Sequence, residues 1–201
     1  MTATPNSIEP TRTRDGFRLP APGVWEVDPG HADVAFVGRH FMLTKIRGRF
    51  TDVRGAISIA DDPRESMVEV TIGMASVESG SSVRDDHLRS ADLFDVARFP
   101  EATFRSMSVY WADMSGIVHG ELTIHGVTRA VKLDVDYLGY AAGMTGEHRA
   151  IFSARALINR EDFGITWNMA LETGGVLVSK AIQIEIEVET VLQEQPSSPE
   201  R

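Results

Sequence analysis

The stretch AIQIEIEVET, residues 181–190, alternates strictly between apolar and polar side chains. Successive side chains of a β-strand point to opposite faces, so a period of two places all the apolar residues of this stretch on one face. A strand of this kind has one side on a hydrophobic core and the other in water, which is typical of an antiparallel sheet. The predicted core face carries Ile182, Ile184, Ile186 and Val188, and the predicted water face carries Gln183, Glu185, Glu187 and Glu189.

The same alternation recurs along most of the chain. It is clear in VEVTI at 68–72, IVHGELTI at 117–124 and AVKLDVDYLG at 130–139, and weaker at 34–37, 55–59, 103–111 and 151–158. Turn-forming residues separate these runs at 60–65, 125–129 and 140–148. Many short strands with few helices predict an all-β fold, either a closed antiparallel barrel of about eight strands or a sandwich. A barrel of that size can enclose one small ligand instead of a solid core.

Composition limits the class of protein. The chain has 201 residues, 42% of them hydrophobic and 24% charged, as in an ordinary soluble globular protein. Its formal net charge of -9 would repel a phosphate backbone, which argues against nucleic acid as a partner. The absence of cysteine excludes disulfides, thiol catalysis and cysteine zinc sites.

The two ends of the chain differ in composition from its middle. Residues 1–22 are rich in Thr, Pro, Arg and Glu, and residues 193–201 are polar and contain prolines. We therefore expect a disordered N-terminal arm at 1–22, one folded domain at 23–192 and a disordered tail at 193–201. No stretch approaches the ~20 apolar residues that span a bilayer, and the first residues hold no apolar run of signal-peptide length. These features predict a cytoplasmic protein without a transmembrane segment.

The predicted interior need not be full. In IFSARALINR, residues 151–160, one face carries Phe152, Ala154, Ala156 and Ile158, and two of these four side chains are small. Small inward side chains either leave room for a ligand or accommodate a bulky side chain from across the barrel. The residues alone leave both interpretations open.

RDDHLRSADLFD, residues 84–95, interrupts the alternation. Its apolar residues are spaced as in a short helix, and Asp85 and Asp86 near its start suit the positive end of a helix dipole. One hypothesis makes His87 a general base paired with Asp85 or Asp86. A second has Arg84 and His87 present cationic donors to an anionic ligand head. A third gives the segment only the role of closing one barrel end. No second motif supplies a nucleophile or an oxyanion site, which counts against an enzyme.

Other candidate residues carry weaker signals. The histidines at 31, 40, 87, 119, 125 and 148 form no HExxH motif and show no familiar ligand spacing, so we predict no metal site. In WEVDPGHADVAFVGRHFM, residues 25–42, either Arg39 or His40 is a candidate for the opening of a cavity. Residues 165–178 lack clear alternation and contain two adjacent glycines, so they form a lid over the barrel mouth, a long hairpin loop or a dimer contact.

Several segments together resemble the YceI-like family. They are WEVDPGHADVAF with RGRF at 47–50, then RDDHLRSADLFDVARFPEATFRS, GELTIHGVTRAVKL and NREDFGI, and they occur in the family's order. The resemblance implies a lipocalin-like antiparallel β-barrel with an elongated apolar interior. It also implies that this interior binds a long isoprenoid-type lipid, such as a polyprenyl or quinone-like chain, and that the protein is a homodimer.

The residues and the resemblance together predict a non-enzymatic protein that binds and carries, or senses, an isoprenoid-type lipid, without catalytic residues, metal or cofactor. Two alternatives remain: an enzyme that acts on an apolar substrate through a His–Asp pair, and a solid-core, stress-related dimeric interaction module. Three residues are predicted to contact the lipid head group: His40, Arg84 and His87. Seven are predicted to line the interior: Phe36, Leu122, Leu133, Phe152, Ala154, Ala156 and Ile184.

Overall fold

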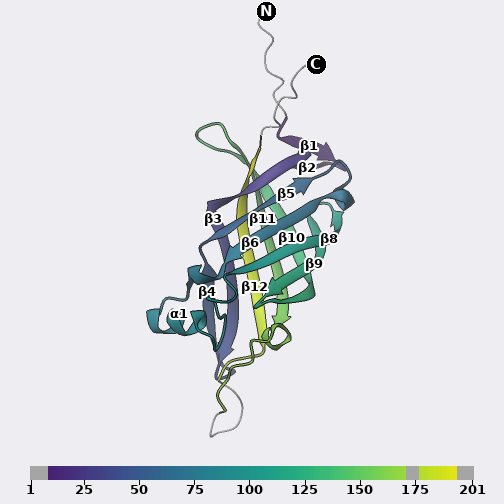
Figure 1. Ribbon diagram of the computed structural model, residues 1–201. Helices are drawn as coiled ribbons and strands as arrows, with labels where there is room; N and C mark the ends of the chain where they lie inside the picture. Colours follow the sequence, from purple (N-terminus) through teal and green to yellow (C-terminus); the bar gives the residue numbers. More distant parts are fainter. Residues whose placement is uncertain (1–8, 171–176, 194–201) are drawn as a thin grey trace, which may run out of the picture.

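The strands of this chain close into an antiparallel β-barrel with one short helix at its side (Figure 1). The computed structural model describes residues 9–170 and 177–193. In chain order the elements are β1 (Thr11–Arg14), β2 (Phe17–Pro20), β3 (Gly23–His40), β4 (Thr44–Phe50), β5 (Val53–Ile59), the 3-10 turn η1 (Pro63–Glu65), β6 (Met67–Gly73), η2 (Met74–Ser76), β7 (Val77–Glu78), α1 (Ser82–Arg89), β8 (Glu101–Ala112), β9 (Ser115–Ile124), β10 (Val127–Ala142), β11 (His148–Asn159), η3 (Arg160–Phe163) and β12 (Ala181–Leu192).

Eight of these strands form the ring of the barrel. Their order is β3, β5, β6, β8, β9, β10, β11 and β12, and β12 pairs back onto β3 to close the ring. The closing register places Ile184 opposite Phe36. The predicted all-β barrel of about eight strands is therefore confirmed, and the sandwich is wrong because its sheets would not join at both edges.

The apolar residues of β12 face the interior, as the alternation predicts. Its isoleucines face the barrel interior, and its glutamates face outward, where Glu185 lies 3.6 Å from the guanidinium of Arg47 on β4. A charged side chain stays in water at little cost, whereas an isoleucine gains free energy by leaving it. The period of two thus sets which face of the strand lies inside.

Strand β3 is long enough to belong to two parts of the fold. Its first residues, 23–26, pair with β5 in the ring, and its last residues, 34–40, pair with β4 in a hairpin. Strand β4 in turn pairs with the short β7, which leads into α1. This extension explains why α1 lies beside one end of the barrel (Figure 1).

The helix is shorter than the segment 84–95 in which we expect it. It ends at Arg89, because Ser90 has an extended backbone and the chain then folds back through turns. In these turns the N–H of Phe94 donates to Leu88 O at 3.0 Å, and the N–H of Asp95 donates to Ser90 O at 2.8 Å. Among the described helices, none combines the length and apolarity needed to cross a membrane.

The N-terminal arm differs from the expectation as well. Within it, β1 and β2 form a hairpin at the barrel end opposite α1 (Figure 1). Leu19 is buried in a cluster with Trp25 of β3, and the Trp25 indole N–H donates to Ala21 O at 3.0 Å. The apolar residues hidden among polar ones in this arm therefore anchor it. Residues 1–8 of the expected arm and residues 194–201 of the expected tail lie outside the described residues.

Candidate functional site

A cavity of about 780 Å³ lies inside the barrel. This volume falls within the usual range for small-molecule sites, roughly 300–1,000 Å³. The wall is built from the inward faces of the ring strands, with side chains such as Val70, Leu133 and Ile186. All seven residues predicted for the interior line it: Phe36, Leu122, Leu133, Phe152, Ala154, Ala156 and Ile184. Their contact with a lipid stays a prediction.

The alanines of β11 face open space. Ala154 and Ala156 are buried in the barrel and both line the cavity. Between them Arg155 points outward, which is what the period of two requires. Of the two interpretations of this strand, the one that leaves room for a ligand matches the structure.

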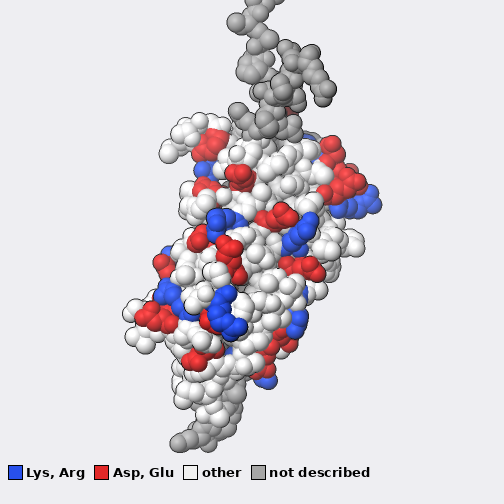
Figure 2. Space-filling model, viewed as in Figure 1, with Lys and Arg blue, Asp and Glu red and all other residues white. Residues whose placement is uncertain are grey.

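The cavity wall carries charge of one sign. Among the described residues that line it there is no aspartate or glutamate, although the whole chain has a net charge of -9. On the face that Figure 2 shows, acidic groups lie on the outer surface and mix with basic ones. The ionisable residues of the wall are Arg12, Arg39, Arg84, Arg160, His40 and His87.

His87 lies on α1 and contacts two groups. Its Nε2 is 3.2 Å from a carboxylate oxygen of Asp92, and its ring packs edge-on against Trp167 at 4.5 Å between centroids. The hypothesis that His87 pairs with Asp85 or Asp86 is wrong. The Asp85 carboxylate accepts a hydrogen bond from Ser79. Asp86 is exposed and forms an ion pair with Arg89 at 3.3 Å.

Arg84 and Asp85 share one partner. Arg84 donates from Nε to the Ser79 hydroxyl at 2.7 Å and from Nη2 to Ser79 O at 2.6 Å. The buried Asp85 carboxylate accepts the Ser79 N–H at 2.8 Å and also the Ser79 hydroxyl. These bonds fasten α1 to the end of β7. The predicted head-group residue Arg84 lines the cavity, but much of its donor capacity serves this structural role.

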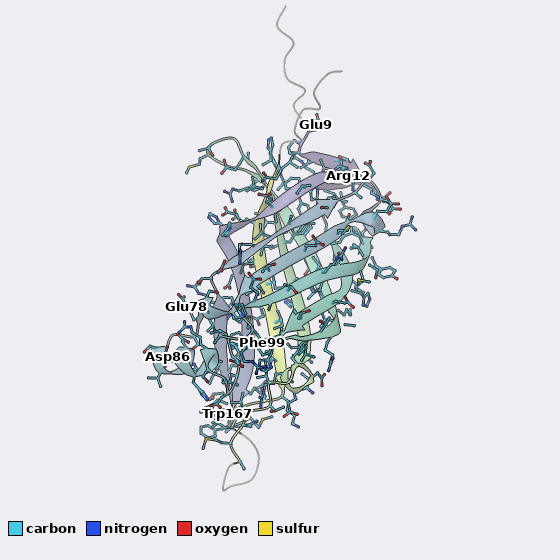
Figure 3. The ribbon with its side chains drawn as sticks, in the orientation of Figure 1. Glu9, Arg12, Glu78, Asp86, Phe99 and Trp167 are labelled. Atoms are coloured by element: carbon cyan, nitrogen blue, oxygen red, sulfur yellow. The ribbon has the colours of Figure 1, made fainter. Side chains whose placement is uncertain are left out.

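His40 lies at the end of β3, on the same side of the barrel as α1. It forms an isolated β-bridge with Val178 and stacks on Phe41 at 4.0 Å between ring centroids. The chain on both sides of residues 171–176 is held here by Asn168, whose amide donates to Val178 O at 2.8 Å and accepts the Val178 N–H at 3.0 Å. The structure thus brings His40 and His87 to one end of the cavity, near Trp167 (Figure 3).

The expected lid or dimer contact at 165–178 is described only in part. Ile165, Trp167, Leu177 and Val178 line the cavity, which places both ends of the segment at its α1 end. Residues 171–176 lie outside the described part of the chain. The lid, the long hairpin loop and the dimer contact therefore all stay predictions.

Arg160 is a site residue that our list of candidates misses. It is 5% exposed, and it lines the cavity at the start of η3. Nε donates to Ser179 O at 3.0 Å, and Nη1 donates to Ile165 O at 2.7 Å and Trp167 O at 2.9 Å. Burial lowers the pKa of Arg160 below its ordinary value, while the nearby Glu161 carboxylate acts in the opposite direction. A guanidinium nevertheless keeps its charge at neutral pH.

The signal for Arg160 is present in the sequence. The inward face of β11 runs through Phe152, Ala154, Ala156 and Ile158, and one further step of the same period reaches residue 160. A charged residue that continues an apolar face is unusual, because an unpaired buried charge is costly. That step identifies Arg160 as an inward-facing cation.

A second polar cluster lies apart from the cavity wall. Asp28 accepts from Arg149 at 2.6 Å and lies 2.8 Å from His31 Nδ1, and Glu189 accepts from the same Arg149 at 2.8 Å. Mainly because of the Arg149 hydrogen bond, the pKa of Asp28 is lowered to about 2. Asp28, His31 and Glu189 lie close enough to share one cation, and Arg149 provides that charge. The prediction of no metal site stays a prediction.

Comparison with known proteins agrees with the fold and the motifs. Residues 25–190 match the YceI-like domain. A UPF0312 protein of Pectobacterium carotovorum is 34% identical over 179 residues, which cover 89% of this chain and 90% of that protein. The crystal structure of a YceI protein from Campylobacter jejuni has a TM-score of 0.66 at 31% identity, covering 78% of this chain and 90% of that one.

A second similar structure is more distant in sequence. It is a polyisoprenoid binding domain from Saccharophagus degradans, with a TM-score of 0.61 at 18% identity, covering 86% of this chain and 100% of that one. At this identity the likeness concerns the fold alone. The domain match over most of the chain and the Pectobacterium relative show the family directly: this chain belongs to the YceI-like domain family.

Proposed function

We propose that the barrel binds a long isoprenoid-type lipid in its cavity and carries or senses that lipid without catalysing a reaction. The observation that carries the proposal is the internal cavity of about 780 Å³ with a wall of mostly apolar side chains. The name of the Saccharophagus domain, which shares the fold, gives independent support for a polyisoprenoid as the ligand.

The energetics favour an apolar chain as the occupant. Each methylene moved from water into such a cavity gains about 0.8 kcal/mol. Several isoprene units therefore offset the cost of immobilising the ligand, with few polar contacts. A short polar metabolite would lose its hydrogen bonds to water and find few replacements along this wall.

The two alternatives have less support. The solid-core module predicts a filled barrel, and the cavity contradicts it. The enzyme hypothesis pairs His87 with Asp85 or Asp86, yet these two carboxylates bond to Ser79 and Arg89, and the Asp92 carboxylate that His87 contacts is exposed. The sequence also supplies no nucleophile or oxyanion motif, which favours the non-enzymatic proposal.

A homodimer and a cytoplasmic location complete the proposal. Both come from the sequence, the first through the family resemblance. Sedimentation equilibrium tests the dimer, and fractionation of the cells that produce the protein tests the location.

The lipid proposal is tested by native mass spectrometry of the protein after gentle purification from its own cells, followed by organic extraction. We expect a stoichiometric adduct that yields a prenyl lipid on extraction. The extracted protein is then incubated with polyprenols, polyprenyl phosphates and quinones. A protein that is empty as purified, and stays empty after these incubations, would overturn the proposal.

A further inference from the structure

Arg160 is a buried cation without a carboxylate partner among the described residues. Its three hydrogen bonds all go to backbone carbonyls, of Ser179, Ile165 and Trp167. The adjacent Glu161 forms an ion pair with Lys180 at 2.8 Å instead. Carbonyl dipoles compensate a buried charge only in part, so a site of this kind gains free energy when an anion enters it.

One donor of this guanidinium is unused. Within residues 9–170 and 177–193, the buried Nη2 of Arg160 has no hydrogen-bond partner. Leaving a buried N–H unpaired costs free energy, and charged donors cost more than neutral ones. Because Arg160 lines the cavity, the missing acceptor can be supplied from the cavity side.

The residues that line the cavity around Arg160 favour a negatively charged acceptor. Trp167, whose carbonyl accepts from Arg160, packs against the His87 ring. Ser179, whose carbonyl also accepts from Arg160, donates its N–H to Arg39 O at 3.0 Å. No described acidic side chain lines the cavity. A group bound beside Nη2 thus meets no described carboxylate on the cavity wall, although the protein is acidic overall.

We infer that Arg160 receives the anionic head group of the bound lipid, with its Nη2 N–H donating to a phosphate or carboxylate oxygen. The inference rests on the proposed function, because it names the polar end of the same ligand. The head lies at the α1 end of the cavity, near Trp167 (Figure 3). The chain extends along the alanine face of β11 toward Phe152, which packs in the same cluster as Leu19 of the N-terminal hairpin.

The first test uses the unaltered protein and three ligands with the same chain: farnesyl monophosphate, farnesoic acid and farnesol. Binding is measured by isothermal titration calorimetry at fixed ionic strength after the native lipid is extracted. We expect at least one anionic ligand to bind about tenfold or more tightly than farnesol, as a charge-assisted hydrogen bond in a buried site predicts. Tight binding of the phosphate alone identifies a phosphate head, and equal binding of both anions identifies a general anion site.

The second test locates the preference on Arg160. We expect Arg160→Met to reduce the affinity for the favoured anion to that for farnesol, while the farnesol affinity stays unchanged, and Arg160→Lys to retain part of the preference. Arg155→Met is the matched control, because Arg155 lies on β11, the strand that leads into Arg160, and faces outward. Since Arg160 also holds three carbonyls, each variant is first checked by circular dichroism and thermal melting.

The outcomes separate this inference from the proposed function. Equal affinity of the wild-type protein for all three ligands overturns the anion site and leaves the lipid-binding proposal intact. Failure to bind any of these ligands or the longer prenyl chains overturns the lipid proposal itself. If Arg84→Gln or His87→Gln removes the preference while a folded Arg160→Met keeps it, the head group lies on α1 and Arg160 is not its receptor. If Arg160→Met does not fold, the anion preference is compared in Arg84→Gln, His87→Gln and Arg160→Lys instead. Loss of the preference in an α1 variant with full retention in Arg160→Lys places the head group on α1.

Discussion

Ala154 and Ala156 determine how much of the barrel stays open beside β11. Both face the cavity, and Leu157, the next residue along, faces outward and is 74% exposed. Replacing either alanine by phenylalanine puts a ring where the ligand chain is proposed to lie. The neighbouring outward position provides a control with the same substituent on the same strand.

We predict that Ala154→Phe and Ala156→Phe each weaken lipid binding and leave the barrel folded. A phenyl ring displaces roughly two or three methylene groups of ligand, and at about 0.8 kcal/mol each the loss is about 2 kcal/mol, or roughly thirtyfold in Kd. Titration with a prenyl ligand measures the effect, and Leu157→Phe is expected to bind as the wild type does. Unchanged affinity in both alanine variants would show that the lipid lies elsewhere.

The Asp28–Arg149 pair makes the stability of the protein depend on pH. Arg149 holds the pKa of Asp28 at about 2, below its ordinary value of 3.8. A carboxylate whose pKa is lowered by folding stabilises the protein above its unfolded pKa, and that contribution is lost as the pH falls toward the folded pKa. Because the Asp28 side chain is 19% exposed, solvent reduces the contribution to about 1 to 2 kcal/mol.

We therefore predict that Asp28→Asn lowers the free energy of unfolding by about 1 to 2 kcal/mol at pH 7, and that the difference from wild type shrinks as the pH is lowered from 4 toward 2. Urea unfolding at pH 7, 4 and 2.5 measures it. Asp86→Asn removes an exposed carboxylate and is expected to have little effect at any pH. A difference that stays constant over this pH range would contradict the linkage to Asp28.

At the residue scale, the sequence predicts side-chain direction better than side-chain partners. The period of two identifies every wall residue that we name for the interior, since direction alternates along a strand. It does not identify Asp92 as the neighbour of His87, because Asp92 lies in the turns after α1. It also does not identify Ser179 as a partner of Arg160, since these residues come from different segments.

Polar side chains hold helix α1 to the segment that precedes it. Asp85 is buried and accepts the backbone N–H of Ser79, whereas the next residue, Asp86, is exposed. Arg89 adds hydrogen bonds to Ala75 O at 2.8 Å and Val77 O at 2.7 Å. The helix therefore depends on polar contacts with the chain just before it as well as on apolar packing.

We predict that Asp85→Ala loosens α1 without opening the barrel. The change leaves the half-buried Ser79 N–H without its acceptor, which costs roughly 1 to 3 kcal/mol. Hydrogen exchange at the amides of residues 82–89 should become about tenfold faster or more, while the amides of β11 and β12 keep their protection. Asp86→Ala, one residue away, is the control and should exchange as wild type does. Equal protection of α1 in both variants would show that the Asp85 contacts do not hold the helix.

The element boundaries show what local pattern cannot supply. The expected helix includes Leu93 and Phe94 because their spacing is helical, but the chain leaves the helix at Ser90 and presents them from turns. The N-terminal hairpin is hidden in the sequence because only a few of its residues, such as Phe17 and Leu19, are apolar. Its position depends on Trp25 and Tyr137, so tertiary packing and not propensity defines it.

At the scale of the whole molecule, closure of the barrel is the property that the sequence leaves open. Alternation predicts one apolar face per strand, and a sandwich satisfies that pattern as well as a barrel does. The pairing of β12 with β3 joins the two ends of the folded domain. The cavity volume then depends on the strand number and on side chains from all sides, such as Ala156 and Phe104, which no single segment reveals.

A hollow closed barrel has a consequence for stability: its ligand stabilises only the folded state. At a free ligand concentration one hundred times Kd, this linkage adds about 2.7 kcal/mol to the free energy of unfolding. For a domain of this size each kcal/mol raises Tm by about 2–4 °C, so we predict a rise of roughly 5–11 °C when a prenyl ligand is added to extracted protein.

Thermal melting followed by circular dichroism measures this shift, with tryptophan fluorescence as a second signal because Trp111 and Trp167 line the cavity. At the same ligand concentration Ala156→Phe should show a smaller rise, since its affinity is lower, and Leu157→Phe should match the wild type. An identical rise in Ala156→Phe would place the stabilising ligand outside the cavity. Stoichiometric binding in native mass spectrometry with no rise in Tm would mean that the unfolded chain binds the lipid equally well, and the barrel would then not be its specific receptor.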